Sequence, residues 1–207
     1  AYGADLTFTT SIPTTDFYNV AGTDVTVPGN WGTNLDGSGT PATSFGLNAQ
    51  VFHLSNTGAT MSGPLTITGT ASKLIVENVF VASQALNATT DVAAAGVLTI
   101  QSATNPTFGV INTASTVNFD GAGTTASSNN FGNLGLLNGG LLPVGSVGVF
   151  GTFNPGSTSS AVAGNIFSFN GTAAQTIPRF TFDSLIVNNT AGTSTGGSSA
   201  AVAANKG

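Results

Sequence analysis

Charged side chains are the scarcest feature of this 207-residue chain, since Asp, Glu, Lys and Arg together make up only 5% of it. A typical soluble domain has about 25%. The basic residues are Lys73, Arg179 and Lys206, which are too few to neutralise a run of phosphates or to hold an anionic membrane surface. We therefore expect no nucleic-acid partner.

Cysteine is absent, which excludes disulfides, thiolate metal ligands and a cysteine nucleophile. The single histidine, His53, has no second His or Cys for a transition-metal site, and no motif places a serine and an acid around it. We interpret it as a surface or sheet-packing residue. The eight acidic residues are scattered, so a solenoid glycosidase is only a third alternative. The sequence predicts no cofactor, no metal and no enzymatic activity.

Long uninterrupted apolar runs are also missing. The most apolar window, from Leu134 to Phe153, is broken by glycines, an asparagine and a proline, which predicts buried strands and tight turns rather than a membrane span. The segment 34–40 contains Asp36 and loosely resembles a calcium loop, but it lacks the closing Glu of an EF-hand. We interpret it as a turn, with calcium binding as the alternative.

Apolar and small polar residues alternate in many segments of the chain. Such a period-two pattern predicts half-buried strands, and turn residues such as Asn138-Gly139 and Asn170-Gly171 separate them. Only the segment 91–97 has any helical character. The alternating pairs are Leu6 and Phe8, Val25 and Val27, Leu65 and Ile67, Leu98 and Ile100, Val117 and Phe119, and Phe167 and Phe169.

Two segments of the chain resemble each other at an offset of about 50 residues. The stretch from Val117, "VNFDGAGTTASSNNFGNLGLLNG", aligns with the stretch from Phe167, "FSFNGTAAQTIPRFTFDSLIVNN". Repeated strand-and-turn units cannot bury their apolar faces alone and are typical of stacked architectures. Three strands are predicted in the second unit, over 166–169, 175–177 and 180–187. The predicted fold is all-β, a β-solenoid or β-helix of stacked strands, with a pilin-like β-sandwich completed by a donor strand as the alternative.

The segment from Ile166 to Thr190 resembles the repeats of secreted, Thr-, Asn- and Gly-rich adhesin-like surface proteins of Bacteroidetes-type bacteria. The match is weaker over 117–139 and is not traceable over 1–50. This resemblance implies a stacked-β architecture outside the cell and brings no catalytic residues. Asp183-Ser184-Leu185 is similar to the O-glycosylation motif of the same proteins, and Asn87, Asn170 and Asn188 begin N-x-Ser/Thr sequons. These four residues are the hypothetical glycosylation sites.

The chain divides into three regions of different composition. Residues 1–50 hold the only Trp and both Tyr and form an N-terminal β segment, either a cap or a donor strand; residues 51–190 form the repeat-like β domain; residues 191–207 form a small-residue tail. The alternating N-terminal run could pair with a sheet edge of another subunit, or it could be an ordinary first strand. Its hypothetical assembly residues are Leu6, Phe8, Thr10 and Ile12.

The low charge bears directly on assembly. A surface poor in Lys and Glu lacks the side chains that normally keep sheet edges apart, so head-to-tail association of copies is weakly opposed. We expect a non-enzymatic structural subunit of an extracellular or cell-surface filament, a homopolymer held by β-sheet contacts and by N-terminal strand exchange. The alternative is an adhesin or glycan-binding module that recognises surface glycans through exposed Trp31, Tyr18 or ladders of Thr and Asn.

Overall fold

The computed structural model describes residues 13–191 and 193–195, and this part of the chain is all-β. Its one helical element is the 3-10 turn η1 (Pro28–Asn30). None of the described residues belongs to a helix with the length and apolarity that a membrane span requires. The assembly hypothesis on Leu6, Phe8, Thr10 and Ile12 falls outside the described residues.

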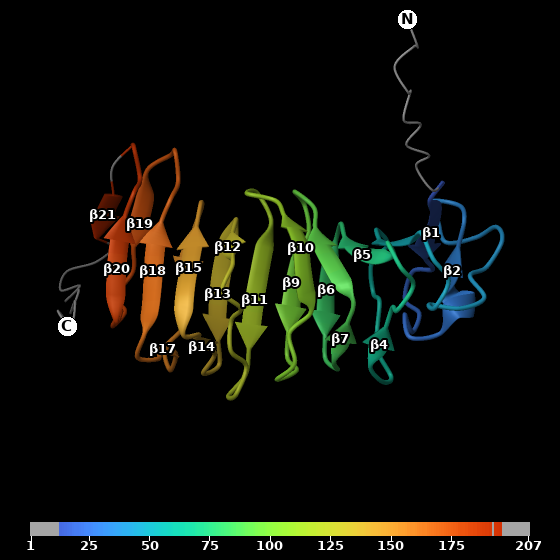
Figure 1. Cartoon of the computed structure of the whole chain (residues 1–207), viewed down its shortest axis with the longest axis horizontal. Coiled ribbons are helices and arrows are strands. Elements are labelled where there is room, and N and C mark those ends of the chain that lie inside the picture. Colours follow the sequence, from blue (N-terminus) through green and yellow to red (C-terminus); the bar gives the residue numbers. More distant parts are fainter. Residues whose placement is uncertain (1–12, 192, 196–207) are drawn as a thin grey trace, which may run out of the picture.

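The strands form three parallel stacks that follow one another around a common core, which is a β-solenoid (Figure 1). The first stack holds β1 (Thr15–Asn19), β3 (Gln50–Leu54), β5 (Lys73–Val76), β8 (Thr89–Val92), β10 (Thr107–Ile111), β12 (Asn130–Phe131), β15 (Gly145–Val149), β18 (Asn165–Phe169) and β20 (Ser184–Val187). The second holds β6 (Val79–Ala82), β9 (Val97–Ile100), β11 (Thr116–Asp120), β13 (Asn133–Leu137) and β16 (Phe153–Asn154). The third holds β4 (Leu65–Thr66), β7 (Leu86–Asn87), β14 (Leu141–Leu142) and β17 (Ser160–Ala161).

The first stack is hydrogen-bonded in two parts, β1 to β10 and β12 to β20. Strands β10 and β12 each lead directly into a second-stack strand, β11 and β13, and these two are paired in parallel. Edge-to-face contact between Phe108 of β10 and Phe131 of β12, with ring centroids 5.9 Å apart, continues the core across the junction. The predicted solenoid is thus confirmed, and the sandwich alternative is not the fold of this chain.

The registers give the length of one turn of the solenoid. Phe52 lies opposite Leu74, and Leu74 lies opposite Thr90, so successive turns here take 22 and 16 residues. Later turns cluster near 18 or 19 residues, as between Leu98 and Val117. The 50-residue offset seen in the sequence is therefore not the structural repeat. Its two segments fold as β11 and β18, which belong to different stacks.

Most of the predicted strands are present with the predicted faces inward. Leu65 and Ile67, Leu98 and Ile100, Val117 and Phe119, and Phe167 and Phe169 are all buried, because alternate residues of a strand point to the same side of the sheet. The apolar window 134–153 folds as parts of four strands, β13 to β16, as predicted.

Three local predictions were wrong. Val25 and Val27 do not form a strand: the Asp24 carboxylate accepts from the Thr26 backbone N–H at 2.9 Å and turns the chain, which buries Val25 and exposes Val27. Residues 93–96 form the turn between β8 and β9 and not a helix. The strand predicted over 180–187 begins only at Ser184 in β20, while 175–177 is β19 (Gln175–Ile177), paired with β21 (Thr193–Thr195).

Phenylalanine fills the C-terminal half of the core. Phe153 packs against Phe167 with ring centroids 4.5 Å apart and against Phe180 edge-to-face at 5.3 Å, and Phe182 packs on Phe167 at 5.2 Å. Aromatic pairs in these geometries add about 0.5–1.5 kcal/mol each beyond the area they bury. The inside of the solenoid is thus a packed apolar column with many aromatic rings in its C-terminal half, and only its outer faces and its ends are available for partners.

Candidate functional site

The N-terminal end of the described solenoid is closed. The chain between β1 and β3 folds across it, and β2 (Trp31–Gly32) pairs with β1 in the only antiparallel strand pairing of the described sheets. Trp31 is 0% exposed, packs edge-to-face on Phe52 at 5.2 Å, and donates its indole N–H to the Val25 carbonyl at 2.9 Å. The expectation that Trp31 contacts a glycan is wrong, because the large apolar ring covers the end of the core.

At the C-terminal end of the described solenoid, β20 is the last described strand of the first stack (Figure 1). Leu185 and Val187 of β20 lie opposite Phe167 and Phe169, which are fully buried, so they occupy inward positions. Yet Val187 is 46% exposed, since no described strand lies beyond β20 in its stack. One backbone edge of β20 is unpaired within the described residues, and the end of the apolar column lies beside it.

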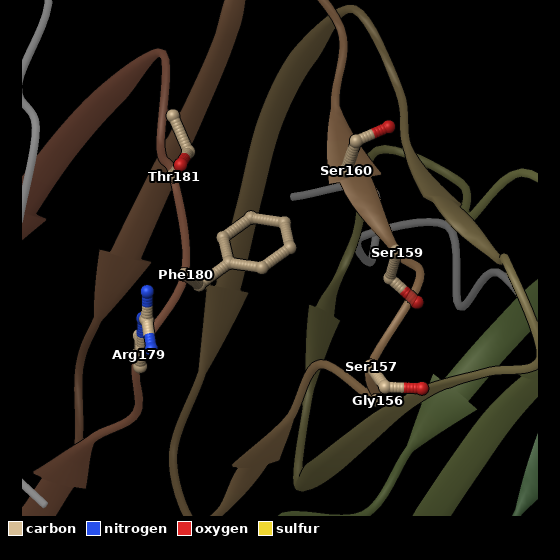
Figure 2. Close-up of a pocket in the computed structure, with 7 residues that line it drawn as sticks. All are labelled: Gly156, Ser157, Ser159, Ser160, Arg179, Phe180 and Thr181. Atoms are coloured by element: carbon tan, nitrogen blue, oxygen red, sulfur yellow. The ribbon is translucent and has the colours of Figure 1, made fainter. Parts of the chain in front are cut away.

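A hollow of about 550 Å³ lies on the third face near this end, between the segment 156–160 and the segment 179–181 (Figure 2). Its lining is polar except for Phe180, whose ring faces Ser159 and Ser160 across the hollow. Arg179 and Thr181 lie on the same side as the Phe180 backbone. The solenoid period explains the juxtaposition: Leu141 lies opposite Ser160, and one further turn of the same length reaches the 179–181 segment.

The second face presents columns of polar side chains, most of them uncharged. Asn118 lies opposite Thr99 in the register and donates to the Thr99 hydroxyl at 3.2 Å. Asp120 accepts from Gln101 at 3.0 Å on one side and from Asn138 at 2.6 Å on the other. A shallow groove of about 260 Å³ runs along this face, lined by Thr116, Asn118, Asn133, Leu134, Gly135, Thr152 and Asn154.

The hypothetical glycosylation residues are not brought together. Asn87 is exposed on the third face and donates to the Thr66 hydroxyl at 3.2 Å. Asn170 and Asn188 belong to one ladder, in which Asn188 donates to Asn170 at 3.1 Å and Asn170 donates to Ser168 at 3.0 Å. Ser184 is partly buried at the start of β20. The amide nitrogens of all three asparagines are thus engaged in hydrogen bonds, which join neighbouring turns at Asn87 and Asn188 and stay within one turn at Asn170.

His53 is part of a cluster that the sequence did not reveal. Its Nδ1 lies 2.8 Å from a Glu77 oxygen, its Nε2 lies 3.4 Å from an Asp16 oxygen, and its ring stacks on Tyr18 at 4.7 Å. Burial raises the pKa of the Tyr18 hydroxyl, and the two nearby carboxylates raise it further. These residues come from different turns, so only the register could have shown that they meet. The cluster holds the first three turns together.

The acidic residues that drew attention are engaged in turns and pairs. Asp36 accepts from the backbone N–H and the hydroxyl of Ser38 at 2.9 and 2.6 Å, hydrogen bonds that lower its pKa. The segment 34–40 is therefore built as a turn around its carboxylate. Asp91 is buried, accepts from Lys73 at 2.6 Å and from the Val110 backbone N–H at 2.7 Å. Within residues 13–191 and 193–195, no group of His, Asp or Glu side chains is placed to hold a metal ion.

Comparison with known proteins adds no relative: no family model, no curated protein and no solved structure matches this chain.

Proposed function

We propose that this chain is a non-enzymatic structural subunit of an extracellular or cell-surface filament, a homopolymer in which the solenoid of one copy continues head-to-tail into the next. The observation that supports the proposal most directly is the open end at β20, where inward-facing Val187 stays 46% exposed and a backbone edge is unpaired among the described residues. Strand addition to such an edge supplies main-chain hydrogen bonds and covers the apolar column in one step. The resemblance of 166–190 to secreted adhesin-like repeats supports the location.

The side chains of β20 do not oppose such an addition. The strand reads Ser-Leu-Ile-Val and carries no charge, whereas exposed edges in soluble proteins are usually protected by Lys, Pro or bulges. Its two outward positions are Ser184 and Ile186, and Ile186 is exposed. A strand with alternating apolar residues therefore meets no charged side chain on β20 itself.

Covalent length shows that the proposed donor run would have to come from another copy. Leu6 lies nine residues before Thr15 of β1, a reach of about 32 Å at most for a fully extended chain. The outer side of β20 is about nine strand spacings from β1, or roughly 43 Å at about 4.8 Å per strand. The residues Leu6, Phe8, Thr10 and Ile12 thus cannot lie beside β20 of their own chain.

Negative-stain electron microscopy of purified material tests the proposal, with uniform filaments as the expected result. Deleting residues 1–12 leaves every described strand intact and should give a folded subunit that sediments as a monomer. If the truncated chain forms filaments of unchanged length, the hypothesis of N-terminal strand exchange is refuted. End-to-end stacking of the solenoids then remains as the mode of assembly. Monomers from the intact chain at every concentration tried would contradict the filament itself.

A second candidate function is an adhesin or glycan-binding module, and the polar groove of the second face favours it. Thr and Asn side chains recur there in register from turn to turn, which suits the repeating hydroxyls of an extended glycan. A glycan array probed with the monomeric truncated protein separates the two functions. Retention of a neutral glycan that is lost on Asn118→Ala would support the adhesin.

A further inference from the structure

Arg179 is the one basic side chain of the described residues that has no partner there. Lys73 is paired with Asp91 at 2.6 Å, and Lys206 lies outside the described residues. Arg179 makes neither an ion pair nor a hydrogen bond with any described residue, and it is exposed. In a chain with a net charge of −5, an exposed guanidinium that lines this hollow and has no described partner attracts anions to it.

The hydroxyls around the hollow are available as well. Ser157, Ser160 and Thr181 are exposed, and their hydroxyls make no hydrogen bond with the described residues. A hydroxyl both donates and accepts, so it can follow the mixed donors and acceptors of a polyol. Figure 2 shows these groups distributed on both sides of the Phe180 ring, which gives the hollow one apolar wall.

The segment that carries the serines of the hollow is hydrogen-bonded to the preceding turn of the solenoid. Ser159 donates its hydroxyl to the Leu136 carbonyl at 2.9 Å, which ties the segment to the preceding turn of the solenoid. Gly156 has a φ of +64°, and a Cβ there would lie 2.4 Å from the same carbonyl oxygen. The close approach therefore requires glycine, and the loop that carries Ser157 and Ser160 is fixed by packing.

We propose that this hollow binds an acidic saccharide, with Arg179 on the carboxylate of a uronic acid and the free hydroxyls on the sugar ring. A planar guanidinium matches a carboxylate with two parallel hydrogen bonds. The volume falls within the range of small-molecule sites, about 300–1,000 Å³, and has room for one or two sugar rings. A single cation suits one carboxylate, whereas a polyphosphate would require several. The inference does not depend on filament formation.

The test is a calorimetric titration of the full chain with a trimer of galacturonic acid, beside the neutral galactose trimer. We expect saturable binding of the acidic trimer and at least tenfold weaker binding of the neutral one. Arg179→Gln should weaken binding of the acidic trimer at least tenfold. Arg179→Lys keeps the charge but loses the two parallel hydrogen bonds to the carboxylate, so it should weaken this binding severalfold. Because Arg179 has no described contacts, circular dichroism and melting temperature should not change.

The serines provide a matched pair. Ser160→Ala should weaken binding of the acidic trimer two- to fivefold. Ser83 is an exposed serine before β7 and away from the hollow, so Ser83→Ala should leave this binding unchanged. Equal binding of the acidic trimer by Arg179→Gln, or equal affinity for the neutral trimer, would overturn the proposal. Absence of binding of the acidic trimer up to 10 mM would also overturn the proposal. Equal affinity for inorganic phosphate and the acidic trimer would overturn it too, because the hollow would then be a general anion site.

Discussion

The open end of the solenoid makes a quantitative prediction at Val187. Val187→Asp places a carboxylate at an inward position of β20 that is 46% exposed in the single chain and becomes buried if another strand adds. In the monomer the carboxylate keeps contact with water, so the change should be tolerated. In a filament it would be buried without a partner.

The magnitude follows from burial. A fully buried Val contributes about 1.5–3 kcal/mol, so covering its remaining exposed half contributes roughly 1 kcal/mol to association. Burying an unpaired carboxylate adds a cost of at least about 2 kcal/mol. The sum, about 3 kcal/mol or more, corresponds to a critical concentration at least about 100-fold higher. Val187→Ala, which loses only the apolar part, should raise the critical concentration about fivefold.

The assay is pelleting of filaments over a concentration series, with far-UV circular dichroism to show that each variant is folded. Val81→Asp is the matched control, because Val81 is 39% exposed but points outward on β6, the first strand of the second stack, away from β20. It should assemble like the parent chain. If Val187→Asp and Val81→Asp assemble at the same critical concentration, the end at β20 is not an assembly surface and the reasoning is refuted.

Three further predictions concern stability, each measured by urea unfolding. Trp31→Ala should cost about 3–5 kcal/mol and open the N-terminal end first, which hydrogen exchange would show as faster exchange in β1 than in β11; equal exchange would contradict the capping role. Gly132→Ala should cost over about 2 kcal/mol, because its Cβ would lie 2.6 Å from three backbone oxygens, while Gly63→Ala, with open space around it, should be neutral. Hydrogen bonds from Ser62 and Thr26 lower the Asp24 pKa from 3.8 to about 2. That carboxylate therefore stabilises the fold above about pH 4, by roughly 1–2 kcal/mol once solvent screening is allowed for, and loses this effect as the pH falls toward 2. Asp24→Asn should therefore reduce the loss of stability between pH 5 and pH 2.5 that the parent shows, and the lowered pKa of Asp36 leaves part of that loss in place.

How far the sequence predicted this molecule depended on the range of the interactions involved. Alternation at Leu98 and Ile100, or at Phe167 and Phe169, is a local property of a strand with one buried side, and it predicted both the strands and their inward faces correctly. Asn138 and Gly139 were likewise readable as a turn, and both have positive φ. The length of a turn could not be predicted, because loops of different size let the turn from β1 to β3 take 35 residues, the next 22 and the one after it 16.

The functional features depended on contacts between turns. The only arginine was conspicuous in the sequence, but its place across the hollow from Ser157 and Ser160 follows from the solenoid register. Trp31 could equally have been an exposed binding residue until the fold placed it over the end of the core.

By itself the sequence determined that the fold is all-β, since period-two alternation bounded by turn residues recurs along the chain, but it left a solenoid and a sandwich as alternatives. It also excluded disulfides and cysteine chemistry, because the chain has no Cys. Only the tertiary structure decided which residues meet, which end is closed by Trp31 and which is open at Val187. The physical reason is that parallel pairing joins residues about one turn apart, and the register between turns is set by loops and side-chain packing that no local pattern records.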